Sequence, residues 1–182
     1  MQLRRERQSD EAAVRQLHEE AFGDHGTVVA RLVDALRASV DPNRGLSLVA
    51  EADGELVGHV TFSPSLLDAP SRLVEVQVLS PIAVAPQRQL RGIGSALVRS
   101  GLEAMTEQGV PVVFLEGSPD YYARFGFLPG ADLGFRKPSL RIPDAAFQAI
   151  RLPSYEPWMT GTLVYAESFW RCDAVGLRDV EP

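Results

Sequence analysis

The feature that most constrains the fold is a strand pattern that leads directly into a helix start. Residues 73–84 (LVEVQVLSPIAV) alternate at first and then become continuously apolar, which is typical of a central strand. Pro81 cannot donate to a neighbouring strand, so a bulge or a splay is expected there. Residues 92–108 have helical spacing, and Gly109 ends them. A buried strand followed by a helix after a short loop indicates a sheet with helices packed on it.

Helical and strand periods alternate along the rest of the chain. Ser9 or Asp10 can cap a helix, and Asp53-Gly54 between two apolar runs is a strong hairpin signal. The order is strand, two helices, three strands, helix, strand, short helix and late strands, which predicts an α/β or α+β fold with a mixed sheet. Besides the segments above, the expected elements are strands at 2–7, 110–116, 147–152 and 161–166, a helix at 27–38 and a short helix after Ser118.

Composition and charge exclude several classes of protein. The 182 residues are 45% hydrophobic and 23% charged, which is typical of a globular protein, and we expect one domain over 1–182. The net charge of −6 argues against nucleic-acid binding. No apolar run is long enough for a membrane span, and the first ten residues lack the apolar segment of a signal peptide, so a cytoplasmic protein is expected. Cys172 is the only cysteine, which excludes an internal disulfide and a cysteine-rich metal site.

The loop before the predicted helix has the features of an anion site. Gly92 and Gly94 mark the helix start, and Arg88, Arg91 and Arg99 lie in or beside it. Unpaired backbone N–H groups at a helix N-terminus attract phosphate, and glycine allows a close approach. Two alternatives remain for the glycines. They could serve only tight helix–strand packing, or belong to a dinucleotide-binding turn, although that turn would need a third glycine where Leu97 stands.

Two segments resemble known motifs. VLSPIAVAPQRQLRGIGSALV is similar to the acyl-CoA-binding motif of the GNAT superfamily of N-acyltransferases, with Gln89-x-x-Gly92-x-Gly94 in register. YYARFGF resembles the superfamily's Tyr-x-x-x-Gly-Phe segment, which begins here at Tyr122. The resemblance covers a core to about residue 130, and the proline-rich part at 131–182 is similar to a bacterial GNAT subgroup. It implies a mixed, splayed β-sheet of about six to seven strands flanked by helices. Leu90 departs from the small residue usual at its position.

The resemblance also implies how acetyl-CoA, as co-substrate, would be held. The backbone amides of residues 89–95 would surround the diphosphate, and the pantetheine arm would lie along residues 82–84 as an added strand. The N–H of Val84 or Ile82 would face the thioester carbonyl. No metal is needed. The implied cofactor-binding residues are Ile82, Ala83, Val84, Gln89, Leu90, Arg91, Gly92, Ile93, Gly94 and Ser95.

The sequence indicates a general acid more clearly than a general base. Tyr122 matches the superfamily's usual general acid, and a phenol can protonate a departing thiolate; the alternative is that Tyr122 only packs. The base is open. Relatives that acetylate protein lysines carry a glutamate where Val78 stands, and Glu75 could act through a water. His59 is expected to be a structural histidine, and His18 is expected to be solvated.

The sequence thus predicts an N-acetyltransferase that acts on a primary amine, preferably of a small molecule, by direct attack in a ternary complex. A non-catalytic acyl-CoA-binding sensor is the alternative from another class, favoured by the missing strand glutamate. Protein N-acetylation is disfavoured by Val78. No membrane or nucleic-acid partner is expected, and a homodimer is left open.

Overall fold

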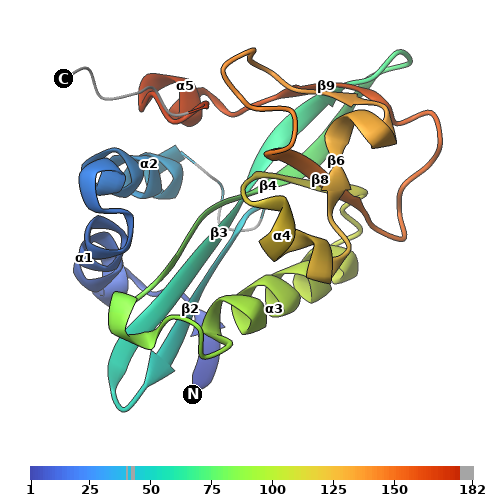
Figure 1. Cartoon of the computed structure of the whole chain (residues 1–182). Coiled ribbons are helices and arrows are strands. Elements are labelled where there is room, and N and C mark those ends of the chain that lie inside the picture. Colours follow the sequence, from blue (N-terminus) through green and yellow to red (C-terminus); the bar gives the residue numbers. More distant parts are fainter. Residues whose placement is uncertain (40, 42–43, 177–182) are drawn as a thin grey trace. The chain divides into compact units, whose positions relative to one another are not determined.

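The computed structural model describes residues 1–39, 41 and 44–176 (Figure 1). The chain divides into two compact units. The first comprises Met1–Ser63 and Leu79–Ala104, and the second comprises Pro64–Val78 and Met105–Pro182. Two strands and one helix contribute residues to both units, because the unit boundaries fall inside them.

The first unit contains the N-terminal helices and a hairpin. Its strands β1, β2 and β3 pair antiparallel in this order. Asp53 and Gly54 join β2 to β3 with positive φ angles of 55° and 81°, which confirms the predicted hairpin. The elements wholly in this unit are β1 (Gln2–Arg5), η1 (Gln8–Asp10), α1 (Glu11–Phe22), η2 (Gly23–His25), α2 (Gly26–Ser39), β2 (Leu46–Ala52) and η3 (Pro86–Arg88). Three elements belong to it in part: β3 (Glu55–Asp68) as far as Ser63, β4 (Leu73–Val84) from Leu79 onwards, and α3 (Ile93–Glu107) as far as Ala104.

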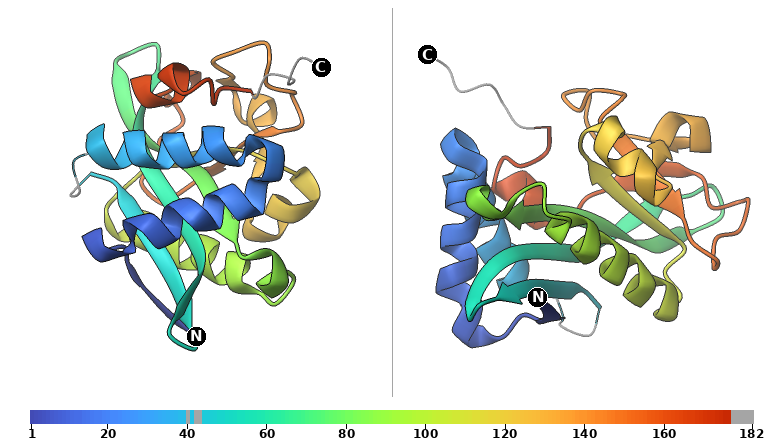
Figure 2. Two further views of the ribbon diagram at one scale, coloured as in Figure 1. Left: turned by 90° about the vertical axis from the view of Figure 1, so that its left-hand side faces the viewer. Right: turned by 60° about the horizontal axis from the view of Figure 1, so that its bottom comes forward.

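Helices cover both faces of the strands in this unit (Figure 2). On one face Val14 of α1 and Val33 of α2 pack on Val49 of β2. On the other face α3 approaches β3 closely. A Cβ on Gly58 would lie 2.8 Å from Ile93 and a Cβ on Gly101 would clash with the Phe62 ring, so both positions accept only glycine without rearrangement.

The second unit is built around β5. β5 pairs antiparallel with β8, β8 pairs with β6, and β9 pairs with both β3 and β7. The parallel pairing of β4 with β5 is short, since only Gln77↔Val113 and Val78↔Phe114 are in register, and this agrees with the expected splay. The elements wholly in this unit are β5 (Val112–Glu116), α4 (Pro119–Tyr122), η4 (Ala123–Phe125), β6 (Leu128–Pro129), η5 (Gly130–Leu133), β7 (Phe135–Arg136), β8 (Phe147–Arg151), β9 (Gly161–Val164) and α5 (Glu167–Arg171).

The predicted fold class is confirmed. In the described residues the strand order is β1-β2-β3-β4-β5-β8-β6, with β7 and β9 off this path, and parallel and antiparallel pairs both occur. The sheet has nine strands where about six to seven were expected. Two of them, β6 and β7, are two residues long and have no periodicity that a sequence could display. No helix of the described chain is both long and apolar enough to span a membrane.

Candidate functional site

The loop between β4 and α3 is held against the end of β4. The amide of Arg88 donates to the carbonyl of Ala85 (2.8 Å), and this bond closes η3. The side-chain amide of Gln89 then reaches back and donates to the carbonyl of Val84 over 3.2 Å. The amide of Ala85 donates to Val57 of β3 over 3.0 Å. These bonds fix the position from which α3 starts.

Gly92 has the conformation and the surroundings of a residue that faces a ligand. Its φ is +83°, and a Cβ there would meet no atom within 4 Å. Glycine at 92 therefore serves the left-handed backbone and leaves open space, so tight packing does not explain it. The amide of Ala96 donates to the Gly92 carbonyl (2.9 Å) and starts the helical bonding. The N–H groups of residues 93–95 precede that bond and have no helical acceptor, as an anion site requires.

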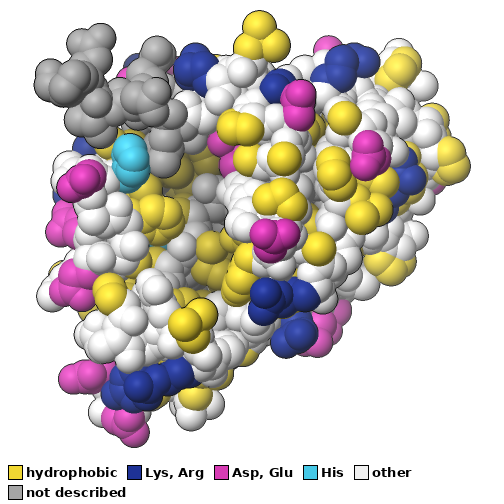
Figure 3. Space-filling view, viewed as in Figure 1, with side chains coloured by type: hydrophobic (Ala, Val, Ile, Leu, Met, Phe, Trp, Pro, Cys, Tyr) yellow, Lys and Arg dark blue, Asp and Glu magenta, His cyan; other side chains and the backbone are white. Residues whose placement is uncertain are grey.

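The residues around Gly92 keep the helix start accessible. Leu90 also has a positive φ, of 60°, and its side chain is fully exposed, so this departure from the family's small residue does not fill the loop. Arg88 contacts the Asp53 carboxylate at 3.3 Å, near the hairpin tip, where basic and acidic side chains lie together (Figure 3). Arg91 is exposed and forms no ion pair within the described residues. The guanidinium of Arg91 is thus available to bind an anion beside the helix start.

The last residues of β4 alternate in burial. Ala83 is buried and packs with Leu17 of α1 and with Ala85, while Phe22 covers the same cluster. Ile82 and Val84 are half-buried. The predicted cofactor residues of the strand and of the loop therefore belong to one unit and are joined by the Gln89–Val84 hydrogen bond.

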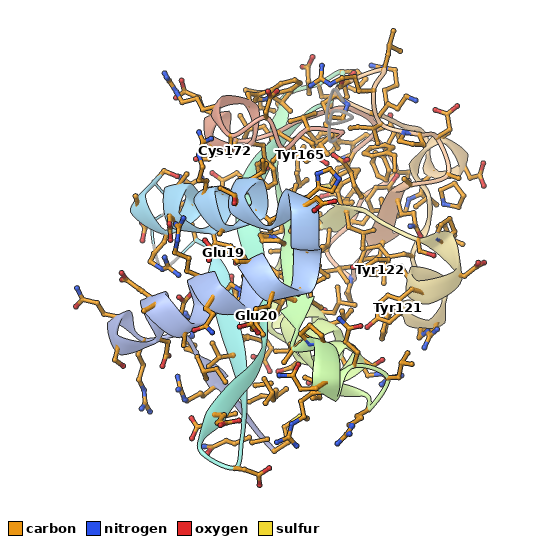
Figure 4. The ribbon with its side chains drawn as sticks, turned by 60° about the vertical axis from the view of Figure 1, so that its left-hand side comes forward. Glu19, Glu20, Tyr121, Tyr122, Tyr165 and Cys172 are labelled. Carbon is orange, nitrogen blue, oxygen red and sulfur yellow. The ribbon has the colours of Figure 1, made fainter. Side chains whose placement is uncertain are left out.

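Tyr122 lies in the second unit, on the last turn of α4 (Figure 4). Its ring is buried edge-on to Tyr121, with 4.9 Å between centroids, and lies 5.8 Å from Phe127. A Cβ on Gly117 would clash with this ring, so Gly117 makes room for it. Burial, and then the neighbouring Tyr121, raise the pKa of Tyr122 well above its ordinary value. The raised pKa keeps the hydroxyl protonated, and it forms no hydrogen bond within the described residues, so it is free to donate.

The candidate base is on β4 in the same unit as Tyr122. Glu75 is exposed, and Val74, Val76 and Val78 on the alternate positions are buried. Val78 pairs with Phe114 of β5 and is fully buried. Position 78, where the resemblance to lysine-acetylating proteins would place a glutamate, is thus apolar core in this chain.

A buried polar network in the first unit was not expected. His18 is fully buried rather than solvated, and the prediction for it is wrong. Its Nε2 lies 2.8 Å from Nδ1 of His59, and Nε2 of His59 lies 2.7 Å from Oγ of Ser47 and 3.3 Å from Glu6. Arg37 donates to the other oxygen of Glu6 over 2.6 Å. His59 is structural, as predicted, because it links α1 to the strands.

The hydrogen bonds assign the direction of this network. Ser47 donates its hydroxyl to Glu6 and so accepts from Nε2 of His59. When the His59 ring carries one proton, its Nδ1 must accept from Nε2 of His18. Nδ1 of His18 then bears a lone pair, and it is buried without a partner in the described residues. The network was invisible in the sequence because its members lie up to 53 residues apart.

The pKa values of His18 and Glu6 in this network are shifted strongly. Burial, followed by the electrostatic effect of the neighbouring His59, lowers the pKa of His18 to about 3. Burial alone would raise the pKa of Glu6, but hydrogen bonds from His59, Ser47 and Arg37 outweigh it and lower that pKa to about 2. At neutral pH the network therefore holds an ionised carboxylate beside an uncharged His18.

Comparisons with known proteins find similarity to N-acetyltransferases over most of the chain. The family profile described as "Acetyltransferase (GNAT) domain" matches residues 2–130. The chain is 34% identical over 131 residues to "Uncharacterized N-acetyltransferase YjhQ" of Escherichia coli K12, covering 71% of either chain. A crystal structure of the GNAT family N-acetyltransferase YhbS from E. coli in complex with CoA aligns with a TM-score of 0.81 and 30% identity, over 93% of this chain and 92% of that one. A GNAT family acetyltransferase from Brucella melitensis in complex with acetyl-CoA aligns with a TM-score of 0.72 and 34% identity, over 92% and 97%.

Proposed function

This chain belongs to the GNAT family of acetyltransferases and is an acetyl-CoA-dependent N-acetyltransferase; we propose that its acceptor is the primary amine of a small molecule. The observation that supports the binding of acetyl-CoA is the loop at Gly92. It combines an open left-handed glycine, free amides at a helix start and an uncommitted arginine in the segment that matches the family motif. Such a combination suits a diphosphate, and the co-substrate carries one.

We assign the binding of acetyl-CoA to residues 82–84 and 89–95. The residues present fit the group, because a side chain at 92 would occupy space that is open here and the N–H groups of 93–95 have no helical acceptor. The amide of Val84 or Ile82 is proposed to donate to the thioester oxygen, where negative charge grows during the reaction. Gln89 occupies the Val84 carbonyl and so positions this end of β4.

The bound co-substrate supplies an activated acetyl group and a thiolate leaving group. We propose that Tyr122 donates its phenolic proton to that thiolate, for which its raised pKa and free hydroxyl are suited. The base is proposed to be Glu75 acting through a water, since its exposed carboxylate can exchange protons with solvent. A neutral amine then attacks the acetyl carbon directly, with no acyl-enzyme.

A small acceptor is favoured over a protein lysine by the apolar strand. Val78 is buried where lysine-acetylating relatives carry a glutamate, so this chain lacks the carboxylate that would receive a proton there. The same absence favours the second candidate, a non-catalytic acyl-CoA sensor. The two differ in turnover, because a sensor would bind acetyl-CoA without releasing free thiol.

The test is a panel of amines assayed by release of the free coenzyme A thiol. The panel should contain amino sugars, polyamines, amino acids and a lysine-containing peptide. We expect turnover with at least one small amine and none above background with the peptide. Tight acetyl-CoA binding without thiol release for any amine would support the sensor, and preferred turnover of the peptide would overturn the small-molecule acceptor.

A further inference from the structure

A cavity lies in the first unit, and the loop at Gly92 is not part of it. Its volume is about 350 Å³, within the range of roughly 300–1,000 Å³ that small-molecule pockets occupy. It is lined by the end of β1 and the segment after it, Glu11 at the start of α1, residues of α2, the start of β2 and Thr61-Phe62 of β3. In the left view of Figure 2, α1 and α2 lie in front of these strands. None of its lining residues belongs to 82–95.

The floor of the cavity is apolar. Val33 and Leu36 of α2, both buried, line it from the helix side, and β2 and β3 line it at Leu46 and Phe62, although the Phe62 ring itself packs beside Gly101 of α3 on the other face. These side chains offer no hydrogen bond to an occupant. The floor therefore suits a compact hydrocarbon or aromatic group, which gains free energy by leaving water.

Two acidic side chains, Glu6 and Glu11, line the cavity, and the carboxylate of Glu6 is already hydrogen-bonded at both oxygens. Glu6 accepts two hydrogen bonds from Arg37 at one oxygen and one from Ser47 at the other. His59 approaches the second oxygen at 3.3 Å. With both oxygens occupied, this carboxylate offers little to a cation and repels an anion only weakly.

Three basic side chains line the cavity, and of these Arg37 is paired with Glu6 and Asp34. Arg4, which points elsewhere, forms ion pairs with Asp10 and Glu51. Arg5 and Arg7 both line the cavity, are exposed, and form no ion pair within the described part of the chain. The charged run at the N-terminus thus divides into a paired arginine and two free ones. The two free guanidinium groups can form charge-assisted hydrogen bonds with a carboxylate.

We propose that this cavity is a second ligand site, which binds a small organic carboxylate with its apolar body on the floor and its carboxylate at Arg5 and Arg7. The site is independent of the acetyl transfer proposed above, because it uses different residues. The expected ligand is an aliphatic or aryl monocarboxylate that is small enough for a cavity of about 350 Å³.

The test uses 4-phenylbutyrate as the probe and 4-phenylbutan-1-ol as its uncharged counterpart. Calorimetry measures affinity, and amide chemical shifts of the full chain locate the binding. We expect the carboxylate to shift the amides of Ser47 and Thr61 and not those of Gly92 and Gly94. Arg5→Ala and Arg7→Ala should each weaken phenylbutyrate binding by roughly tenfold and leave phenylbutanol binding unchanged. Arg31→Ala, an exposed arginine of α2 outside the cavity, is the matched control.

Three results would overturn the site. They are equal affinity for phenylbutanol and phenylbutyrate, unchanged phenylbutyrate binding in both arginine variants, and shifts confined to the Gly92 loop. Because both variants alter exposed side chains, unchanged thermal unfolding verifies that they fold. Coenzyme A, added in a separate experiment, should shift the Gly92 and Gly94 amides. The absence of these shifts would contradict the co-substrate site without affecting the test of the cavity.

Discussion

At the scale of single residues, Gly92 and Gly54 have nearly the same conformation and different roles. Their φ angles are +83° and +81°, and a Cβ at either would meet no atom within 4 Å. Any side chain at these positions therefore costs about 1–2 kcal/mol of backbone strain without a clash. Substitutions at Gly92 and Gly54 can therefore distinguish the stability lost by straining a left-handed residue from the affinity lost by blocking a ligand site.

We expect Gly92→Val to lose most of its affinity for coenzyme A, because the added side chain fills the space proposed for the diphosphate. Gly54→Val, the matched control at the hairpin, should lose a similar amount of stability and keep its affinity. Calorimetric titration with coenzyme A and thermal unfolding measure the two effects. Equal coenzyme A binding by both variants would remove the site from the Gly92 loop.

Tyr122→Phe tests the proposed acid, because it keeps the buried ring and removes only the hydroxyl. We expect kcat to fall by about 10²-fold while coenzyme A affinity changes little. Burial raises the pKa of Tyr122, so the acid limb of the pH–rate profile should be the same in parent and variant. Tyr121→Phe, on the adjacent half-buried ring, is the control. If Tyr122→Phe turns over as fast as the parent with a good amine, Tyr122 only packs.

At the scale of elements, the network of His18, His59 and Glu6 connects α1 and the segment after β1 to the hairpin strands. The pKa of His18 is about 3 when folded and 6.5 in its ordinary state, so the unfolded chain binds the extra proton first as the pH falls. Stability from His18 is thus complete above about pH 6.5 and declines below it. Glu6 adds to the loss only below its ordinary pKa of 4.5.

We therefore expect the free energy of unfolding to fall by about 1 kcal/mol per pH unit through His18 between pH 6.5 and 4.5. His18→Gln retains an N–H for Nδ1 of His59 and cannot titrate, so its stability should vary less with pH by that amount. Urea unfolding at a series of pH values measures this slope. His25→Gln, outside the network, controls for the loss of a histidine. An unaltered slope in His18→Gln would mean that His18 binds its proton equally well in the folded and unfolded chains.

At the scale of the whole molecule, the expectation of one domain over 1–182 makes a prediction about cooperativity. β3, β4 and α3 each contribute residues to both compact units, so one unit cannot unfold completely without disrupting elements of the other. Trp158 and Trp170 belong to the second unit, whereas α1, α2 and most of α3 belong to the first. Tryptophan fluorescence and helical circular dichroism should then give the same urea midpoint. Two separate midpoints would show two domains.

The sequence by itself determined the elements whose pattern is local. β4 was predicted with its observed bounds, and α3 within one residue at either end, because alternation and helical spacing repeat within a few positions. The Asp53-Gly54 hairpin and the loop at Gly92 were likewise readable, since a positive φ is a property of one residue. The candidate cofactor site could be predicted because its strand, loop and helix are consecutive.

Only the tertiary structure decided what depends on distant residues. His18 was predicted to be solvated, yet it is buried because His59, 41 positions later, supplies a hydrogen-bond partner on the facing strand. The free state of Arg5 and Arg7 depends on Asp10 and Glu51 pairing with Arg4 instead. The cavity beside them is bounded by residues of β1, η1, α1, α2, β2 and β3. Burial and charge pairing are set by which segments meet in space, and a local pattern carries no record of that.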